Sequence, residues 1–251
     1  MMVLYKKKEV LFAVMWIVIY VVGSSVMDQF SEQVGMAQCL TIPFHLILIA
    51  GLLTFMIRNG LQRKYGLCRA IHDAGAMLWY VPLAVLASVY LWLGAVQRMP
   101  VTESVIYACS MLLTGVLEEL IFRGLLFRAM SRSNVRSAIV VSSLTFGIGH
   151  IVNLINGSGA DLLSNLLQVM YAVAIGFAFV EVFYRGGSLI PCMVCHSVFN
   201  ALSTFSNEAA WTPGIEIIVS VILIIVAAGY GLWLAKKVPV DDKTADTNIC
   251  E

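Results

Sequence analysis

The sequence contains few charged residues. Only 12% of its 251 residues are Asp, Glu, Lys or Arg, whereas 60% are hydrophobic. In a soluble domain about 25% of the residues are charged, so this composition excludes a soluble domain and indicates a protein that lies in lipid. The net charge of +1 gives no support for binding to nucleic acid.

The local signatures of common hydrolases and redox proteins are also missing. The six Cys lie partly within apolar runs, where they are typical of small buried hydrophobic residues, and we assign no disulfides. No Ser or Cys nucleophile stands beside a base in a familiar signature, and the H-E-x-x-H zinc motif is absent. The stretch from Cys192 to His196 matches the C-x-x-C-H signature of haem attachment. That chemistry needs an aqueous loop, whereas this stretch lies in an apolar run.

What the sequence does contain is a series of long apolar segments. A bilayer core of about 30 Å needs about 20 apolar residues per helix. The segments cover approximately residues 10–27, 40–57, 74–96, 104–130, 137–155, 162–183, 188–205 and 215–235. We therefore predict an all-α, polytopic membrane protein of about eight transmembrane helices. The first segment follows Lys6 to Lys8, as in a signal peptide, but its length and the further spans favour a retained helix.

Basic residues occupy every second connection between these segments. They are Lys6 to Lys8, then Arg58, Arg63, Lys64 and Arg69, then Arg132 and Arg136, then Arg185, and finally Lys236 and Lys237. Because cytoplasmic loops hold the excess of Lys and Arg, we predict that both termini are cytoplasmic. The membrane is expected to be a bacterial plasma membrane. Residues 1–238 are expected to form a single transmembrane domain with a motif-bearing core at 104–205. Residues 239–251 are expected to be a polar, disordered tail in the cytoplasm.

Three of the apolar segments contain polar and ionisable residues at positions deep in the membrane. They are Glu118, Glu119 and Arg123 in the fourth segment, His150 in the fifth, and His196 and Asn200 in the seventh. Ionisable groups at such depths are costly and persist mainly where they face the protein interior and have a function. At 1.5 Å per residue from the nearest cytoplasmic arginine, Glu118 and His150 lie about 21 Å deep and His196 about 16 Å. The three side chains can therefore meet in one layer.

Together these residues suit hydrolysis by activated water. A carboxylate shielded from solvent can act as a general base on water, and imidazole and amide N–H groups can stabilise an oxyanion. Glu119 and Arg123 are four residues apart on one helical face and can neutralise each other, while Glu118 points about 100° away. Two histidines and one carboxylate could instead bind Zn²⁺.

The three motifs, in this order on separate segments, resemble those of the CAAX protease and bacteriocin-processing family, also called the Abi family. They are Glu118, Glu119 and Arg123; Phe146 and His150; and His196 and Asn200. The resemblance, which extends to the type II CAAX prenyl endopeptidases, implies an eight-helix membrane fold and a glutamate-dependent endopeptidase in which Glu118 activates water. It further implies that His150 assists the base and that His196 and Asn200 form the oxyanion site. Glu119 and Arg123 would hold the arrangement, with no cofactor and with zinc less expected.

The resemblance also implies a peptide or protein-tail substrate presented at the lipid bilayer. A prenylated C-terminus, a bacteriocin precursor and a pheromone precursor all fit. Two other function classes stay open: a non-catalytic bacteriocin self-immunity or binding protein that retains the fold, and a small transporter that relays protons through Glu118 and the histidines. The intact motifs favour the enzyme, and the sequence shows no internal repeat of the kind common in transporters.

Overall fold

The computed structural model describes residues 1–154 and 161–240, which form helices and no strands. Six helical segments are long and apolar enough to cross a membrane: α2 (Glu9–Val34), α3 (Thr41–Arg58), Val101–Ser131, Val135–Leu154, α8 (Leu162–Gly186) and α10 (Pro213–Lys237). The prediction of an all-α polytopic membrane protein is confirmed. Of the tail predicted at 239–251, residues 241–251 lie outside the described residues.

Two of these crossing segments are composite. Val101–Ser131 consists of α5 (Val101–Glu119), the π-helix η3 (Leu120–Phe127) and α6 (Arg128–Ser131). Val135–Leu154 consists of α7 (Val135–Gly149) and the 3₁₀-helix η4 (His150–Leu154). The seventh predicted segment forms a shorter helix of 14 residues, α9 (Ile190–Ser203). Two short elements precede α2 and α10: α1 (Met2–Lys7) and η5 (Glu208–Ala210).

The third predicted segment, residues 74–96, does not form one membrane-length helix. It is divided into η1 (Gly75–Tyr80), the seven-residue α4 (Val81–Ala87) and η2 (Val89–Leu91). Pro82 lies in the first turn of α4, where its ring prevents a regular α-helix from extending back toward η1. Residues 78–80 have positive φ angles between 52° and 55°, which also interrupts the helix. The prediction rested on apolar composition, which does not reveal either interruption of the helix.

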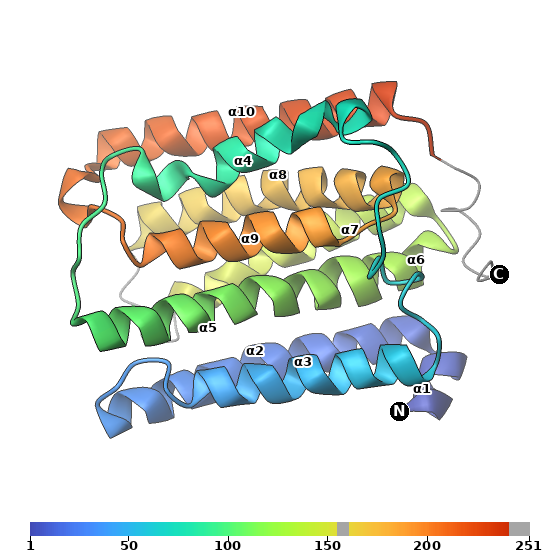
Figure 1. Ribbon diagram of the computed structural model, residues 1–251, viewed down its shortest axis with the longest axis horizontal. Helices are drawn as coiled ribbons and strands as arrows, with labels where there is room; N and C mark the ends of the chain where they lie inside the picture. Colours follow the sequence, from blue (N-terminus) through green and yellow to red (C-terminus); the bar gives the residue numbers. More distant parts are fainter. Residues whose placement is uncertain (155–160, 241–251) are drawn as a thin grey trace.

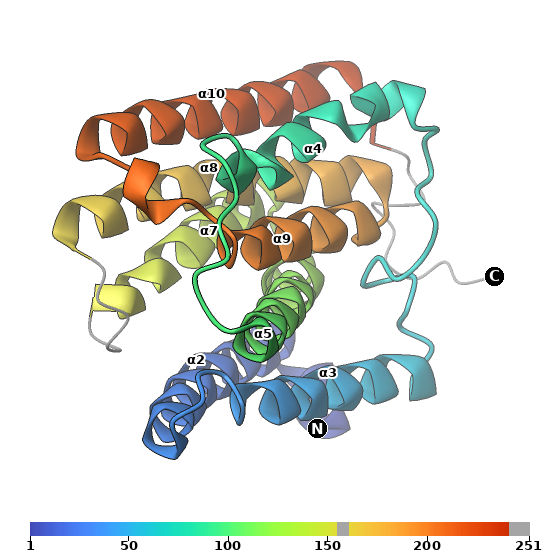
Figure 2. The same cartoon turned by 60° about the vertical axis from the view of Figure 1, so that its left-hand side comes forward.

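The helices lie side by side along the long axis of the molecule, with α4 and α10 at one side and α2 and α3 at the other (Figure 1). A second view shows α5 between the α2–α3 pair and the remaining helices (Figure 2). Helix α5 packs closely on α9, and α8 packs against both α7 and α10. Because α5 lies between these two groups, its side chains can meet residues from both.

The two ends of the bundle differ in charge. The N-terminal helix α1 and the end of α10 lie at one end, together with the ends of α3 and α6 (Figure 1). We call this the basic end, because Arg58, Arg132, Arg185 and Lys237 lie in the last turns of helices or just after them there. The far end contains the α2–α3 connection, the start of α5 and the end of α9. The orientation of these ends in the membrane stays a prediction.

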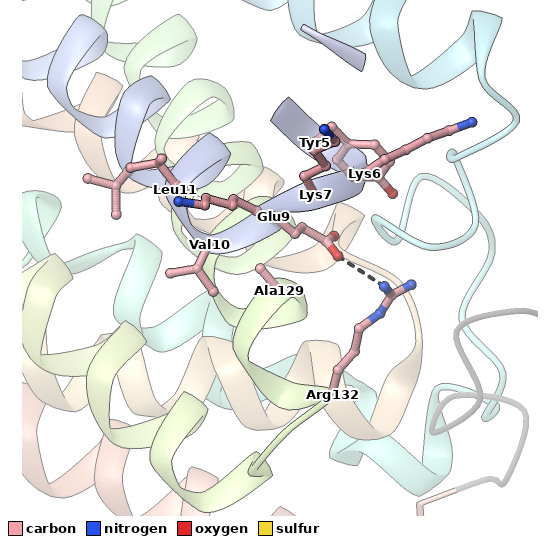
Figure 3. Close-up of a pocket in the computed structure, with 10 residues that line it drawn as sticks. Tyr5, Lys6, Lys7, Glu9, Val10, Leu11, Ala129 and Arg132 are labelled. Atoms are coloured by element: carbon pink, nitrogen blue, oxygen red, sulfur yellow. Dashed lines mark ion pairs between the residues drawn. The ribbon is translucent and has the colours of Figure 1, made fainter. Parts of the chain in front are cut away.

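Glu9 joins three segments at the basic end. Its carboxylate forms an ion pair with Lys64 and accepts a hydrogen bond from the Tyr65 hydroxyl at 3.1 Å. It also forms an ion pair with Arg132 at 3.2 Å, which Figure 3 shows. The Lys64 side chain is only 5% exposed, so its charge is balanced almost entirely within the protein. These contacts attach the start of α2 to the connection after α3 and to the end of α6.

Candidate active site

Glu118 lies in the last turn of α5 and is held by side chains from two other helices. The Tyr20 hydroxyl of α2 donates a hydrogen bond to Glu118 Oε1 at 2.5 Å. The His196 Nε2 of α9 lies 3.3 Å from Glu118 Oε2. The Glu118 side chain is 13% exposed, whereas Tyr20 is 8% exposed. The carboxylate is therefore fixed in place but still reaches an open space.

Glu119 lies behind Glu118 and is fully enclosed. Arg123 Nη1 donates to Glu119 Oε1 at 2.8 Å, and neither side chain has any exposed surface, which confirms the predicted pairing. His196 Nδ1 lies 2.9 Å from the same Glu119 oxygen, so one imidazole ring bridges the two carboxylates. The Arg123 guanidinium stacks 4.0 Å above the centre of the Phe146 ring, a favourable contact for a cation away from water.

The π-helix η3 begins directly after Glu119, and all eight of its residues are buried. A π-helix adds a residue to the turn and leaves backbone groups imperfectly paired, and it is frequently found at functional sites. Here the Ser142 hydroxyl of α7 donates to the Phe122 carbonyl at 3.0 Å. Gly176 of α8 faces the Arg123 guanidinium, and a Cβ there would lie 3.1 Å from Arg123 Nη2. Neighbouring helices thus support the irregular turn and make room for the arginine.

His150 is oriented by backbone contacts at the junction of α7 and η4. Its Nδ1 lies 3.0 Å from the Phe146 carbonyl, which can only accept, so Nδ1 carries the proton in this contact. Asn165 of α8 donates to the His150 carbonyl at 2.8 Å. Within the described residues Nε2 has no hydrogen-bond partner, which leaves it able to bind water.

Helix α9 supplies His196 and, one turn later, the half-buried Asn200. Its close approach to α5 depends on Gly115, because a Cβ there would lie 2.5 Å from the Ser197 backbone nitrogen. The Ser197 hydroxyl donates to the Leu112 carbonyl at 2.8 Å, which fixes the register of the two helices. That register brings His196 to the level of Glu118 and Glu119.

A cavity of about 530 Å³ joins these groups. The four residues predicted to be catalytic all line it: Glu118, His150, His196 and Asn200. The supporting pair, Glu119 and Arg123, is buried outside it. Its lining on α2, α5 and α9 extends from the level of Glu118 toward the far end of the bundle, as far as Glu32 and Ser203. Within residues 1–154 and 161–240, no group of three His, Cys, Asp or Glu side chains could hold a metal ion.

Sequence reasoning missed the contribution of α2 to this site. Tyr20 lies 98 residues before Glu118, and a tyrosine in an apolar segment is unremarkable by itself. The one available signal was periodicity, because Tyr20, Ser24, Asp28 and Glu32 recur every four residues and so share a helical face. That face lines the cavity.

Comparison with known families agrees with this arrangement. The family model for type II CAAX prenyl endopeptidases, Rce1-like, matches residues 100–202. This range is similar to an Rce1-like domain. The resemblance inferred from the three motifs is thereby confirmed, since the Rce1-like domain contains all of them. It begins at the start of α5 and ends within α9, so Tyr20 lies outside it. No curated protein and no solved structure matches the chain.

Proposed function

We propose that this protein is an intramembrane endopeptidase in which Glu118 activates the water that attacks a peptide bond. The observation that carries the proposal is the position of Glu118, a carboxylate fixed by Tyr20 and His196 at the wall of a cavity. The Rce1-like domain supports protease activity of the CAAX type.

In the proposed reaction, a water molecule in the cavity gives a proton to Glu118 while its oxygen attacks the carbonyl carbon of the substrate. His150 assists because its unoccupied Nε2 can accept a hydrogen bond from the same water. The attack forms a tetrahedral intermediate with a negatively charged oxygen. Glu118 then passes the proton to the amine as the carbon–nitrogen bond breaks, which releases both products.

Asn200 is the group best placed to stabilise the negatively charged oxygen. It lines the cavity, and its amide has no hydrogen-bond partner within the described residues. The resemblance implies the same role for His196, but both ring nitrogens of His196 face carboxylates. The role that we assign to His196 is to hold Glu118 and Glu119 in fixed relation, with Arg123 balancing the charge from behind.

The substrate we propose is a peptide or protein tail presented at the membrane, such as a prenylated C-terminus or a bacteriocin or pheromone precursor. The membrane is proposed to be a bacterial plasma membrane. The apolar helices around the site suit a substrate that a lipid group or an apolar segment already holds at the membrane.

The decisive experiment compares the purified protein with Glu118→Gln, which keeps the shape of the side chain but cannot take a proton from water. Farnesylated CAAX peptides and peptides encoded beside the gene are incubated with each protein, and products are identified by mass spectrometry. We expect cleavage by the native protein and a loss of at least about 10²-fold in the variant at equal membrane abundance. Cleavage by the native protein should persist in strong chelators.

Full cleavage by well-folded Glu118→Gln would overturn the glutamate mechanism. Loss of cleavage on chelation, restored by zinc, would replace it with a metalloprotease mechanism. If neither protein cleaves any peptide while both protect cells from a membrane-active peptide, the protein is an immunity protein.

A further inference from the structure

The cavity wall is strongly biased toward negative charge. It includes three carboxylates, Asp28, Glu32 and Glu118, and no Lys or Arg. The chain as a whole is nearly balanced, with 16 basic and 15 acidic residues, so the bias belongs to the cavity and not to the composition. The rest of the lining consists mostly of hydroxyl, amide, apolar and aromatic side chains.

The two outer carboxylates have no cationic partner within the described residues. Asp28 accepts a hydrogen bond from the Thr41 hydroxyl at 2.5 Å, and Glu32 is exposed at the mouth. Arg98, a basic residue at the same end of the bundle, forms an ion pair with Glu208. Arg98 also donates to the backbone carbonyl of Ser203 at the rim of the cavity, at 3.0 Å, but it forms no ion pair with Asp28 or Glu32.

A second observation also points to a ligand in this part of the cavity. His45 lines it and is 2% exposed, and its Nε2 lies 2.9 Å from the Ser24 hydroxyl. Its other ring nitrogen, Nδ1, is buried without a hydrogen-bond partner. A buried polar atom left unpaired is unfavourable, so His45 gains when a polar group of a ligand comes within hydrogen-bond distance of Nδ1.

We propose that the cavity selects peptide segments with Lys or Arg at a set distance from the cleaved bond. This inference rests on the proposed function and names its substrate class. Clefts of one charge sign with low-dielectric walls concentrate ligands of the opposite sign. A peptide cation that reaches Asp28 or Glu32 supplies the positive charge that the protein lacks there.

The positions of Asp28 and Glu32 on α2 set the spacing between the basic residue of the peptide and the cleaved bond. Asp28 and Glu32 follow Tyr20, the residue bonded to Glu118, by eight and twelve positions on one face of α2. At 1.5 Å per residue these positions are about 12 Å and 18 Å from Tyr20 along the helix. An extended peptide advances about 3.3 Å per residue, so its basic residues lie about four to six residues from the cleaved bond.

The test uses one peptide that the native protein cleaves, made in three versions with Lys, Gln or Glu at the positions four to six residues from the cleavage site. Full-length protein in nanodiscs is assayed for kcat/KM. We expect the Lys version to be cleaved about tenfold faster than the Gln version, and the difference to shrink at high salt. Asp28→Asn with Glu32→Gln should abolish the preference, and Glu32→Lys should reverse it toward the Glu version.

Glu103→Gln is the matched control, because Glu103 is an exposed carboxylate near the start of α5 at the same end of the bundle but does not line the cavity. It should leave the preference unchanged. Binding of fluorescent versions of the three peptides to the Glu118→Gln protein measures the same preference without turnover. Equal kcat/KM and equal binding for the Lys and Gln versions would overturn the inference while leaving the proposed function intact. Unchanged cleavage by Glu118→Gln would instead overturn the glutamate mechanism in the proposed function, and absence of cleavage by the native protein would overturn the endopeptidase itself.

Discussion

Tyr20 shows how a single residue from outside the motif region can control the proposed base. Its hydroxyl donates to Glu118 at 2.5 Å, and it is the one contact from α2 to that carboxylate among the hydrogen bonds described. A hydrogen bond to a carboxylate fixes its orientation, and in a low-dielectric setting such a contact is stronger than in water. We therefore assign Tyr20 a positioning role, distinct from the residues that touch substrate.

Tyr20→Phe removes only the hydroxyl and should lower kcat about tenfold with little change in KM, since the base is less well oriented but the cavity keeps its shape. Membrane abundance should stay at the native level. Tyr107→Phe is the control, because Tyr107 lines the same cavity without a contact to Glu118. A fall in abundance equal to the fall in activity would mean that Tyr20 only supports folding.

Arg123 contributes mainly to stability. The side chain is fully buried between Glu119 and the rings of Phe146 and Phe179. Arg123→Ala leaves Glu119 as a buried carboxylate without its cation, a change that costs about 3–5 kcal/mol. We expect low folded yield and a reduced Tm. The double variant Glu119→Gln with Arg123→Met removes both charges and should have a higher Tm than Arg123→Ala. A double variant with a lower Tm than Arg123→Ala would contradict this account.

For single residues, the sequence predicted the contact within one helical motif but not the contacts between helices. The spacing of Glu119 and Arg123 predicted their ion pair, because helical geometry alone places them together. The bridging of both carboxylates by His196 and the contact from Tyr20 depend on how separate helices are arranged. No local pattern encodes that arrangement.

Among the helices, the contact between α5 and α9 determines whether the site forms. Gly115→Ala places a methyl group against the Ser197 backbone, so α9 must move away from α5. We expect a loss of about 1–3 kcal/mol of stability, and a fall in kcat per folded molecule because His196 moves with α9. Gly229→Ala on α10 is the control, since a Cβ there meets nothing within 4 Å. Equal activity for the two purified variants would show that α9 has room to adjust.

The sequence located the helices but not their irregularities. Hydropathy found the segments that became α2, α3, α8 and α10 to within a few residues at most ends. It did not predict the π-helix η3 or the division of residues 74–96, because both depend on backbone geometry. Each irregularity receives a contact from elsewhere: Ser142 bonds to η3, and the Tyr230 hydroxyl donates to the Met77 carbonyl in η1 at 2.9 Å.

For the whole molecule, the basic end is predicted to face the cytoplasm. In a variant whose native Cys are replaced by Ser, single cysteines at positions 63 and 132 should resist a membrane-impermeant thiol reagent added to intact cells. A cysteine at position 103, near the start of α5, should react. The opposite labelling pattern would invert the orientation, and with it the side from which substrate enters the cavity.

The cavity stops at the level of Glu118 and Phe122, and its lining includes none of residues 123–131. On that side the eight residues of η3 are buried in tight packing. Among the described residues, the cavity is therefore open toward the far end and closed toward the basic end. Where a cavity of this kind fills with water, the packed residues on its closed side form most of the insulating layer, so we expect a transmembrane voltage to fall mainly across the basic end and the reacting groups to stay near the potential of the solution at the mouth. The expected consequence is a site that admits water at its mouth while protons do not cross the membrane through it.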